Sequence, residues 1–128
     1  MVVRRRGRRV GVIHIPVSLK ASRQSPGRYE AIFMVDTGAM DSMAPSSDLE
    51  TAGVERIGRE TYELADGSYR EYDFGLVQIE LMGTITAGRV LFGPDGTEPL
   101  LGVTALESAG VTIDPTRQTL RKLPAIRL

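Results

Sequence analysis

Apolar and polar side chains alternate with a two-residue period through much of this chain of 128 residues. That period is typical of β-strands with one buried face. The pattern is clear at residues 13–19, where every odd-numbered position is apolar. Because Pro16 cannot donate a hydrogen bond to a neighbouring strand, we expect this strand at the edge of a sheet, with His14 half exposed.

Other segments carry the same signal, and turn residues separate them. Residues 29–35 have apolar side chains on both faces, as expected for a strand in the centre of a packed structure. The pair Asp66-Gly67 lies between two short strand-like segments and predicts a tight β-hairpin. Further strands are expected at residues 77–81, 84–92, 111–114 and 119–123.

Two segments have the Ser/Thr-x-x-Glu form of a helix capping box instead. They are residues 47–50, which Gly53 follows, and residues 104–107, which Gly110 follows. A glycine at this place is a common end of a helix, so we expect a helix of one or two turns at each segment. The sequence therefore predicts an all-β domain with two short helices.

The net charge of zero hides an uneven distribution. Residues 1–9 contain five arginines and no acidic residue, which leaves 16 − 5 = 11 basic and 16 acidic side chains in residues 10–128. We predict a basic, disordered tail at 1–9 and a single domain at 10–128. A basic run can contact nucleic acid or a membrane, but no aromatic residues interleave with it, so we expect neither partner. No signal peptide or membrane span is recognisable, which favours a cytoplasmic protein.

Composition also narrows the chemistry. The chain has no cysteine, which excludes disulfides, thiol nucleophiles and thiolate metal sites. Its single histidine, His14, argues against a zinc site and against a Ser-His-Asp triad. Carboxylates remain, and we expect neither a metal nor a cofactor.

One carboxylate stands out by its position. Asp36 directly follows the apolar run 31–35 and begins the tetrapeptide Asp36-Thr37-Gly38-Ala39, which occurs once. Burial penalises a charge unless a partner compensates for it, so a carboxylate at the end of a buried strand calls for a chemical explanation. The partner we expect is a second copy of Asp36.

The order of the predicted segments along the chain resembles that of a known protein family. The tetrapeptide, a glycine-tipped hairpin, the segment Leu100-Leu101-Gly102 and a short helix follow one another across residues 28–123. This arrangement resembles the retropepsin-like (retroviral-type, clan AA) aspartic protease family. The resemblance implies a closed β-barrel-like fold in a single-lobe subunit.

The family also implies an activity, aspartic endopeptidase, and a homodimer. Two copies of Asp36 would share one proton; one would activate a water and the other would donate a hydrogen bond to the scissile carbonyl of an extended peptide or protein substrate. Thr37 would hydrogen-bond across the two-fold axis. Gly38 would let the substrate backbone approach, and Ala39 completes the loop.

Two further segments match the family by position. Leu100, Leu101 and Gly102 would pack beneath the catalytic loop. The tip of the hairpin would be a flap that closes over the substrate and pairs with its main chain; its residues are Ala65, Asp66, Gly67 and Ser68. An ordinary surface hairpin is the alternative, because Asp-Gly turns are common and family flaps are often richer in glycine.

The chain departs from the family pattern at two positions that pair in retroviral members. Met40 stands in place of an aspartate after the tetrapeptide, and Val103 in place of an arginine after Leu100-Leu101-Gly102. Losing both partners together avoids an unpaired buried charge. Asp41 is expected to be a solvated loop carboxylate rather than a substrate-binding group, and Thr104 is expected to cap its helix.

Two other functions remain open. The same fold could serve as a dimerisation or peptide-binding module that is catalytically weak or inactive. Alternatively, the arginine run could lead a nucleic-acid-binding protein, although the chain offers no groove-reading motif. The dimer interface is expected first at the C-terminal strand, residues 119–123, because two copies of the basic N-terminus would repel each other.

Overall fold

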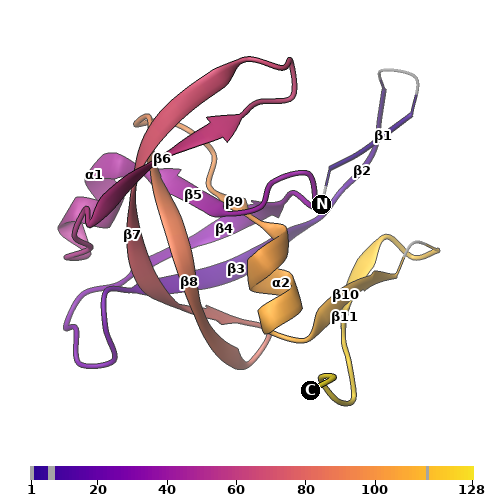
Figure 1. Cartoon of the computed structure of the whole chain (residues 1–128). Helices are drawn as coiled ribbons and strands as arrows, with labels where there is room; N and C mark the ends of the chain where they lie inside the picture. Colours follow the sequence, from indigo (N-terminus) through magenta and orange to yellow (C-terminus); the bar gives the residue numbers. More distant parts are fainter. Residues whose placement is uncertain (1, 6–7, 115) are drawn as a thin grey trace.

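The computed structural model describes residues 2–5, 8–114 and 116–128, and their side chains from residue 12 onward. Most of this part of the chain is β-strand (Figure 1). The strands of the main sheet are β3 (His14–Lys20), β4 (Tyr29–Val35), β5 (Ser42–Pro45), β6 (Gly58–Glu63), β7 (Tyr69–Leu81), β8 (Thr84–Gly93) and β9 (Leu100–Leu101). The helices are α1 (Ser46–Thr51) and α2 (Val103–Ser108).

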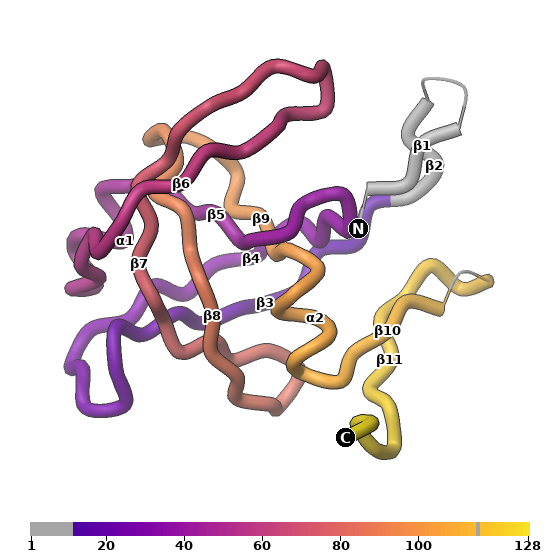
Figure 2. Tube along the Cα trace, in the orientation of Figure 1, coloured from indigo at the N-terminus to yellow at the C-terminus, as the bar shows by residue number. Residues whose placement is uncertain are grey.

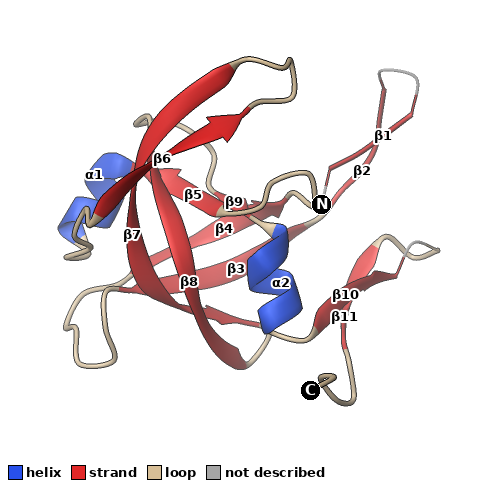
Figure 3. Cartoon of the chain, in the orientation of Figure 1, coloured by secondary structure: helices blue, strands red, loops and turns tan. Residues whose placement is uncertain are grey.

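The main sheet closes on itself. Its strand order is β3-β4-β9-β5-β8-β7-β6, and β3 also pairs with β7, so six strands form a ring. Strand β6 lies outside the ring and pairs with the first half of β7. Both short helices lie on the outside of the strands (Figure 3). The predicted all-β, closed barrel-like fold with two short helices is confirmed.

The core forms inside this ring, where apolar side chains from distant parts of the chain meet. Five of these side chains have at most 1% of their surface exposed: Leu19, Phe33, Val35, Ile79 and Leu101. They come from β3, β4, β7 and β9, so the alternating patterns of these strands point into one shared core. Burial of this apolar surface is what favours closure of the barrel.

The prediction of an edge position for the first strand is wrong over most of its length. β3 pairs with β4 from His14 to Leu19 and with β7 from Val17 to Lys20. Pro16 lies just before the second pairing begins, so the missing N–H donor interrupts no ladder there. Closure of the ring, which depends on contacts distant in sequence, removes the edge.

The two helices occur where the sequence predicts them, but neither begins with the predicted capping box. Pro45 and Gly102 occupy the N-cap positions, and neither helix has a side-chain cap. The hydroxyls of Ser47 and Thr104 bond to other loops instead, at Asp95 and Met40. Gly53 and Gly110 do follow the helices, with the positive φ angles of 85° and 69° that favour glycine.

Four strands lie in two separate ribbons. β1 (Val2–Arg5) pairs with β2 (Arg8–Val12), and β10 (Val111–Asp114) pairs with β11 (Thr119–Lys122). The predicted basic tail overlaps the first ribbon, and its residues 1, 6 and 7 lie outside the described part of the chain. A lone two-stranded ribbon is marginally stable in water, so the division into tail and domain stays a prediction.

Candidate active site

Asp36 directly follows β4, a strand that pairs with β3 on one side and β9 on the other. β9 runs parallel to β4, with Val35 beside Leu101. Figure 2 shows how the chain returns through β9 to lie alongside β4. The Asp36 N–H donates to the Leu101 carbonyl at 3.0 Å, and both Val35 and Leu101 are fully buried. The backbone at Asp36 is therefore fixed by its neighbours.

The tetrapeptide forms a tight turn that its own carboxylate organises. The Ala39 N–H donates to the Asp36 carbonyl at 3.1 Å, and the Gly38 N–H donates to Oδ1 of the Asp36 side chain at 2.9 Å. A Cβ atom at position 38 would lie 3.1 Å from the same Oδ1. Glycine therefore lets the carboxylate rest against the turn, where Asp36 and Thr37 are half-buried and Gly38 is exposed.

The other end of the loop is tied to the segment that follows β9. The Val103 N–H donates to the Ala39 carbonyl at 2.8 Å, and the Thr104 hydroxyl donates to the Met40 carbonyl at 2.8 Å. The Gly102 N–H donates to the hydroxyl of Ser42, which is 2% exposed, at 3.0 Å. The predicted Leu100-Leu101-Gly102 segment thus lies directly against the loop between β4 and β5, residues 36–41, which we call the Asp36 loop.

Gly102 is required by the close approach of two backbones. A Cβ atom there would lie 2.6 Å from the carbonyl carbon of Asp41 and 2.8 Å from the carbonyl oxygen of Met40. Backbone atoms on both sides cannot move aside cheaply. Only a glycine lets the β9–α2 connection pack this closely on the loop.

The predicted hairpin joins β6 to β7, and its tip is built by a turn at Leu64–Gly67. The Gly67 N–H donates to the Leu64 carbonyl at 2.9 Å, and Gly67 has a φ of 86°. The N–H and hydroxyl of Ser68 both donate to Oδ1 of Asp66, and these bonds lower the pKa of that exposed carboxyl. All four predicted tip residues, from Ala65 to Ser68, are exposed. The hairpin is present; its role as a flap stays a prediction.

Asp41 differs from its prediction as a solvated loop carboxylate. Its side chain is only 13% exposed, and it accepts a hydrogen bond from the Tyr62 hydroxyl on β6. Arg89 on β8 donates to the same hydroxyl at 3.3 Å and lies 3.9 Å from the carboxylate. Burial, followed by the bond to Asp41, raises the pKa of Tyr62, so the phenol keeps its proton. Sequence reasoning missed Tyr62 and Arg89, because no local pattern links these positions to Asp41.

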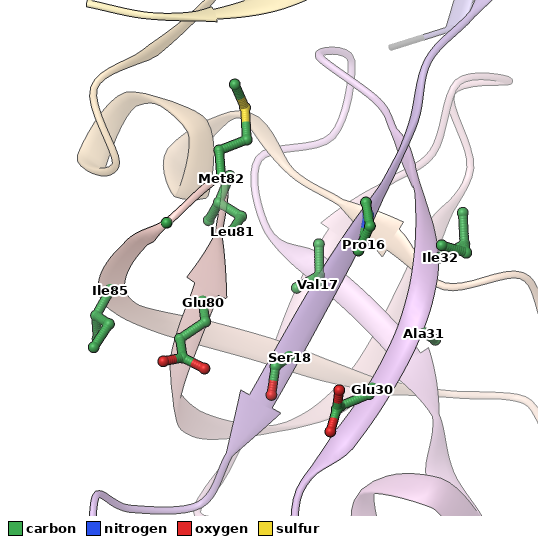
Figure 4. Close-up of a pocket in the computed structure, with 11 residues that line it drawn as sticks. Pro16, Val17, Ser18, Glu30, Ala31, Ile32, Glu80, Leu81, Met82 and Ile85 are labelled. Atoms are coloured by element: carbon green, nitrogen blue, oxygen red, sulfur yellow. The ribbon is translucent and has the colours of Figure 1, made fainter.

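A groove of about 620 Å³ lies elsewhere on the barrel. It is formed by β3, β4 and the turn between β7 and β8, and Ser18 lies between the carboxylates of Glu30 and Glu80 (Figure 4). Pro16, Ile32 and Met82 supply apolar walls. The groove contains no predicted site residue.

Within the part of the chain that the structure describes, no three His, Cys, Asp or Glu side chains gather as metal ligands do. Among the same residues, no helix has the length and apolar character needed to cross a membrane.

Comparison with known proteins gives a structural match only. No protein-family model matches the sequence. No curated protein matches it in sequence either. Among solved structures, the chain is similar to the protease of simian foamy virus (mac), determined in solution, with a TM-score of 0.52 and 17% sequence identity. The match covers 73% of this chain and 91% of the viral chain.

This likeness concerns the fold, and it agrees with the barrel described above. The chain has the all-β fold of a retroviral protease. At 17% identity the comparison does not extend to individual residues. The roles of Asp36 and its neighbours therefore stay predictions.

Proposed function

We propose that this protein is an aspartic endopeptidase that acts as a homodimer. One observation carries the proposal: Asp36 lies in a hydrogen-bonded turn directly after β4, and its carboxylate accepts the Gly38 N–H. The retroviral-protease fold of the chain supports the same activity. Fixed geometry is what a general base needs, because proton transfer depends first on position.

The dimer follows from the chemistry of a single carboxylate. Peptide hydrolysis of this kind needs one carboxylate as a base and a second, protonated one as a hydrogen-bond donor. The chain has one Asp-Thr-Gly loop, so the second carboxyl group would come from Asp36 of another copy. Two such carboxylates a few ångströms apart would share one proton, since both cannot ionise easily.

The proposed hydrolysis proceeds by attack of a water molecule on the peptide bond, followed by loss of the amine. The ionised Asp36 takes a proton from a water molecule while the water oxygen attacks the scissile carbonyl carbon. The protonated Asp36 donates a hydrogen bond to the carbonyl oxygen and stabilises the tetrahedral intermediate. The carbon–nitrogen bond breaks as the leaving nitrogen takes a proton from the pair. No covalent enzyme intermediate forms.

The substrate would be an extended peptide or a protein segment. The hairpin β6–β7 projects at the same end of the barrel as the loop after β4 (Figure 1). A peptide between the two could pair its main chain with the hairpin tip at Ala65–Ser68, which would exclude water from the carboxylates. Gly38, which is exposed, leaves room for the peptide backbone near Asp36.

The test compares the wild-type protein with Asp36→Asn on a mixed peptide library over a range of pH. We expect cleavage between apolar side chains, fastest at mildly acid pH where the pair holds one proton, and no cleavage by the variant. Asp48→Asn makes the same change at an exposed position on α1 and is expected to cleave normally. Cleavage by Asp36→Asn at the wild-type rate would refute the proposal.

The molecular mass in solution gives a second, independent test. Sedimentation at micromolar concentration is expected to show two chains per particle. A dimer that binds peptides but cleaves none would instead indicate the binding module considered above. A protein that stays monomeric with peptide present would leave each Asp36 without its partner, and the protease proposal would fail.

A further inference from the structure

We propose that Tyr62 is a positioning residue, which fixes the β6–β7 hairpin relative to the Asp36 loop through its hydroxyl contacts with Asp41 and Arg89. The inference rests on the proposed function, because it assigns the hairpin a place over the reacting carboxylates. It concerns three side chains from three different elements. They lie in the loop after β4, in β6 and in β8.

The first step is that Asp41 is a fixed anchor. The backbone around it is packed on Gly102, and Ser42, the next residue, accepts the Gly102 N–H. A carboxylate that is 13% exposed needs hydrogen-bond or charge partners in place of water. The hydroxyl of Tyr62, at 2.5 Å from Oδ2 of Asp41, provides one. A bond to a charged acceptor is stronger than a bond between neutral groups.

Arg89 holds the other side of the same hydroxyl. Its guanidinium lies 4.1 Å from the centre of the Phe74 ring and donates to the Tyr62 hydroxyl at 3.3 Å. It is also 3.6 Å from Glu60, two residues before Tyr62 on β6. The positive charge therefore lies between the carboxylates of Asp41 and Glu60. Stacking on the ring and two opposite charges limit its freedom to move.

The contacts of Tyr62 matter because of where β6 lies in the sheet. Among the described strands β6 pairs with β7 alone, so its backbone ladder does not reach the barrel on its other side. Tyr62 lies two residues before Leu64, where the turn at the hairpin tip begins. The Tyr62–Asp41 bond thus connects the outer strand of the hairpin directly to the loop that carries Asp36. Without it, the outer strand would be held by its ladder with β7 and by the exposed ion pair between Glu60 and Arg89.

The first experiment measures hairpin order by amide hydrogen exchange in the full-length protein and needs no catalysis. Tyr62→Phe keeps the ring and removes the hydroxyl. We expect the amides of Leu64 and Gly67 to exchange about tenfold faster in this variant, the size expected for one lost bond to a charged group. The Asp36 amide, which bonds to Leu101, should keep its wild-type rate.

Matched variants separate the hydroxyl contact from a general effect of substitution. Tyr69→Phe removes a hydroxyl from the other strand of the same hairpin, at a side chain that is 71% exposed, and should leave exchange unchanged. Asp41→Ala should reproduce the effect of Tyr62→Phe, whereas Asp41→Asn keeps an acceptor oxygen and should restore part of the protection. Unchanged exchange in Tyr62→Phe would overturn the proposal.

The second experiment asks whether this order matters for the reaction. If Tyr62 positions the hairpin, Tyr62→Phe should raise KM for a cleaved peptide about tenfold, with a smaller change in kcat. The reason is that peptide binding would then have to order the hairpin, and the free-energy cost of this ordering weakens binding. Faster exchange with an unchanged KM would overturn the positioning role. A wild-type protein that cleaves no peptide would refute the proposed protease, and the exchange result would still decide the contact between hairpin and loop.

Discussion

The Asp36 loop and the β6–β7 hairpin are joined by the Tyr62–Asp41 bond, but different kinds of contact hold each of them in place. The loop is tied to β9 and α2 by backbone hydrogen bonds from Asp36 and Val103, above the buried Leu101. The hairpin tip is exposed, and side chains from Tyr62 and Glu60 link its outer strand to the rest. In the proposed protease the loop would supply a fixed carboxylate, and the hairpin would supply a cover that admits and releases the substrate.

This comparison predicts that substitutions beneath the loop reduce the stability of the whole domain. Leu101→Ala removes a fully buried side chain and is expected to lower the free energy of unfolding by about 2–5 kcal/mol. Urea denaturation at fixed protein concentration measures the change. Leu100→Ala, at the half-buried neighbouring position, should cost clearly less. Equal losses in the two variants would contradict the view that the loop rests on Leu101.

A methyl group at Gly102 should have the next largest effect. Gly102→Ala places a Cβ within 2.8 Å of backbone atoms of Met40 and Asp41, so the loop must shift. Overpacking of this kind typically costs about 1–3 kcal/mol. The same variant should lose peptidase activity by more than its stability explains, because the shift moves Asp36. Wild-type activity with wild-type stability would show that the two backbones can separate freely.

The corresponding glycine substitution in the hairpin tests whether its tip can change independently of the rest of the domain. Gly67→Ala meets no atom within 4 Å, but its φ of 86° is unfavourable for a side chain. Holding the native tip geometry would cost about 1–2 kcal/mol of backbone strain, which a local rearrangement of the tip can relieve. Because the tip can rearrange locally, we expect faster amide exchange at Leu64 and Ser68 and nearly unchanged global unfolding. A global loss as large as that of Gly102→Ala would make the hairpin part of the rigid core.

The smallest predicted effect concerns the charge at the hairpin tip. The bonds from Ser68 lower the pKa of Asp66 below its usual 3.8, so ionised Asp66 is favoured in the folded tip. This contribution to tip stability is present above pH 3.8 and is lost as the pH falls through the folded pKa. Carboxyl chemical shifts measured by NMR should show the lowered pKa, and Ser68→Ala should raise it. A pKa of Asp66 that is the same in both proteins would exclude the Ser68 contact.

Local signals in the sequence were sufficient for several features of the fold. The strand at Tyr29–Val35, the hairpin around Asp66-Gly67 and the glycines that end both helices all occur where they were predicted. Each depends on neighbouring residues, either through side-chain alternation or through the backbone freedom of glycine. Predictions that depended on residues distant in the sequence were less accurate. Ser47 and Thr104 fit a capping box locally, yet their hydroxyls found acceptors in other loops.

The sequence by itself determined that a carboxylate would follow a buried strand in a glycine-containing turn, because alternation and turn chemistry act over a few residues. Only the tertiary structure decided what surrounds that turn. Closure of the barrel through β3 and β7, and the return of β9 beside β4, bring together residues that are far apart in the chain. Asp41, Tyr62 and Arg89 meet for the same reason. Their contacts depend on how the strands pair, and strand pairing is a property of the whole folded chain.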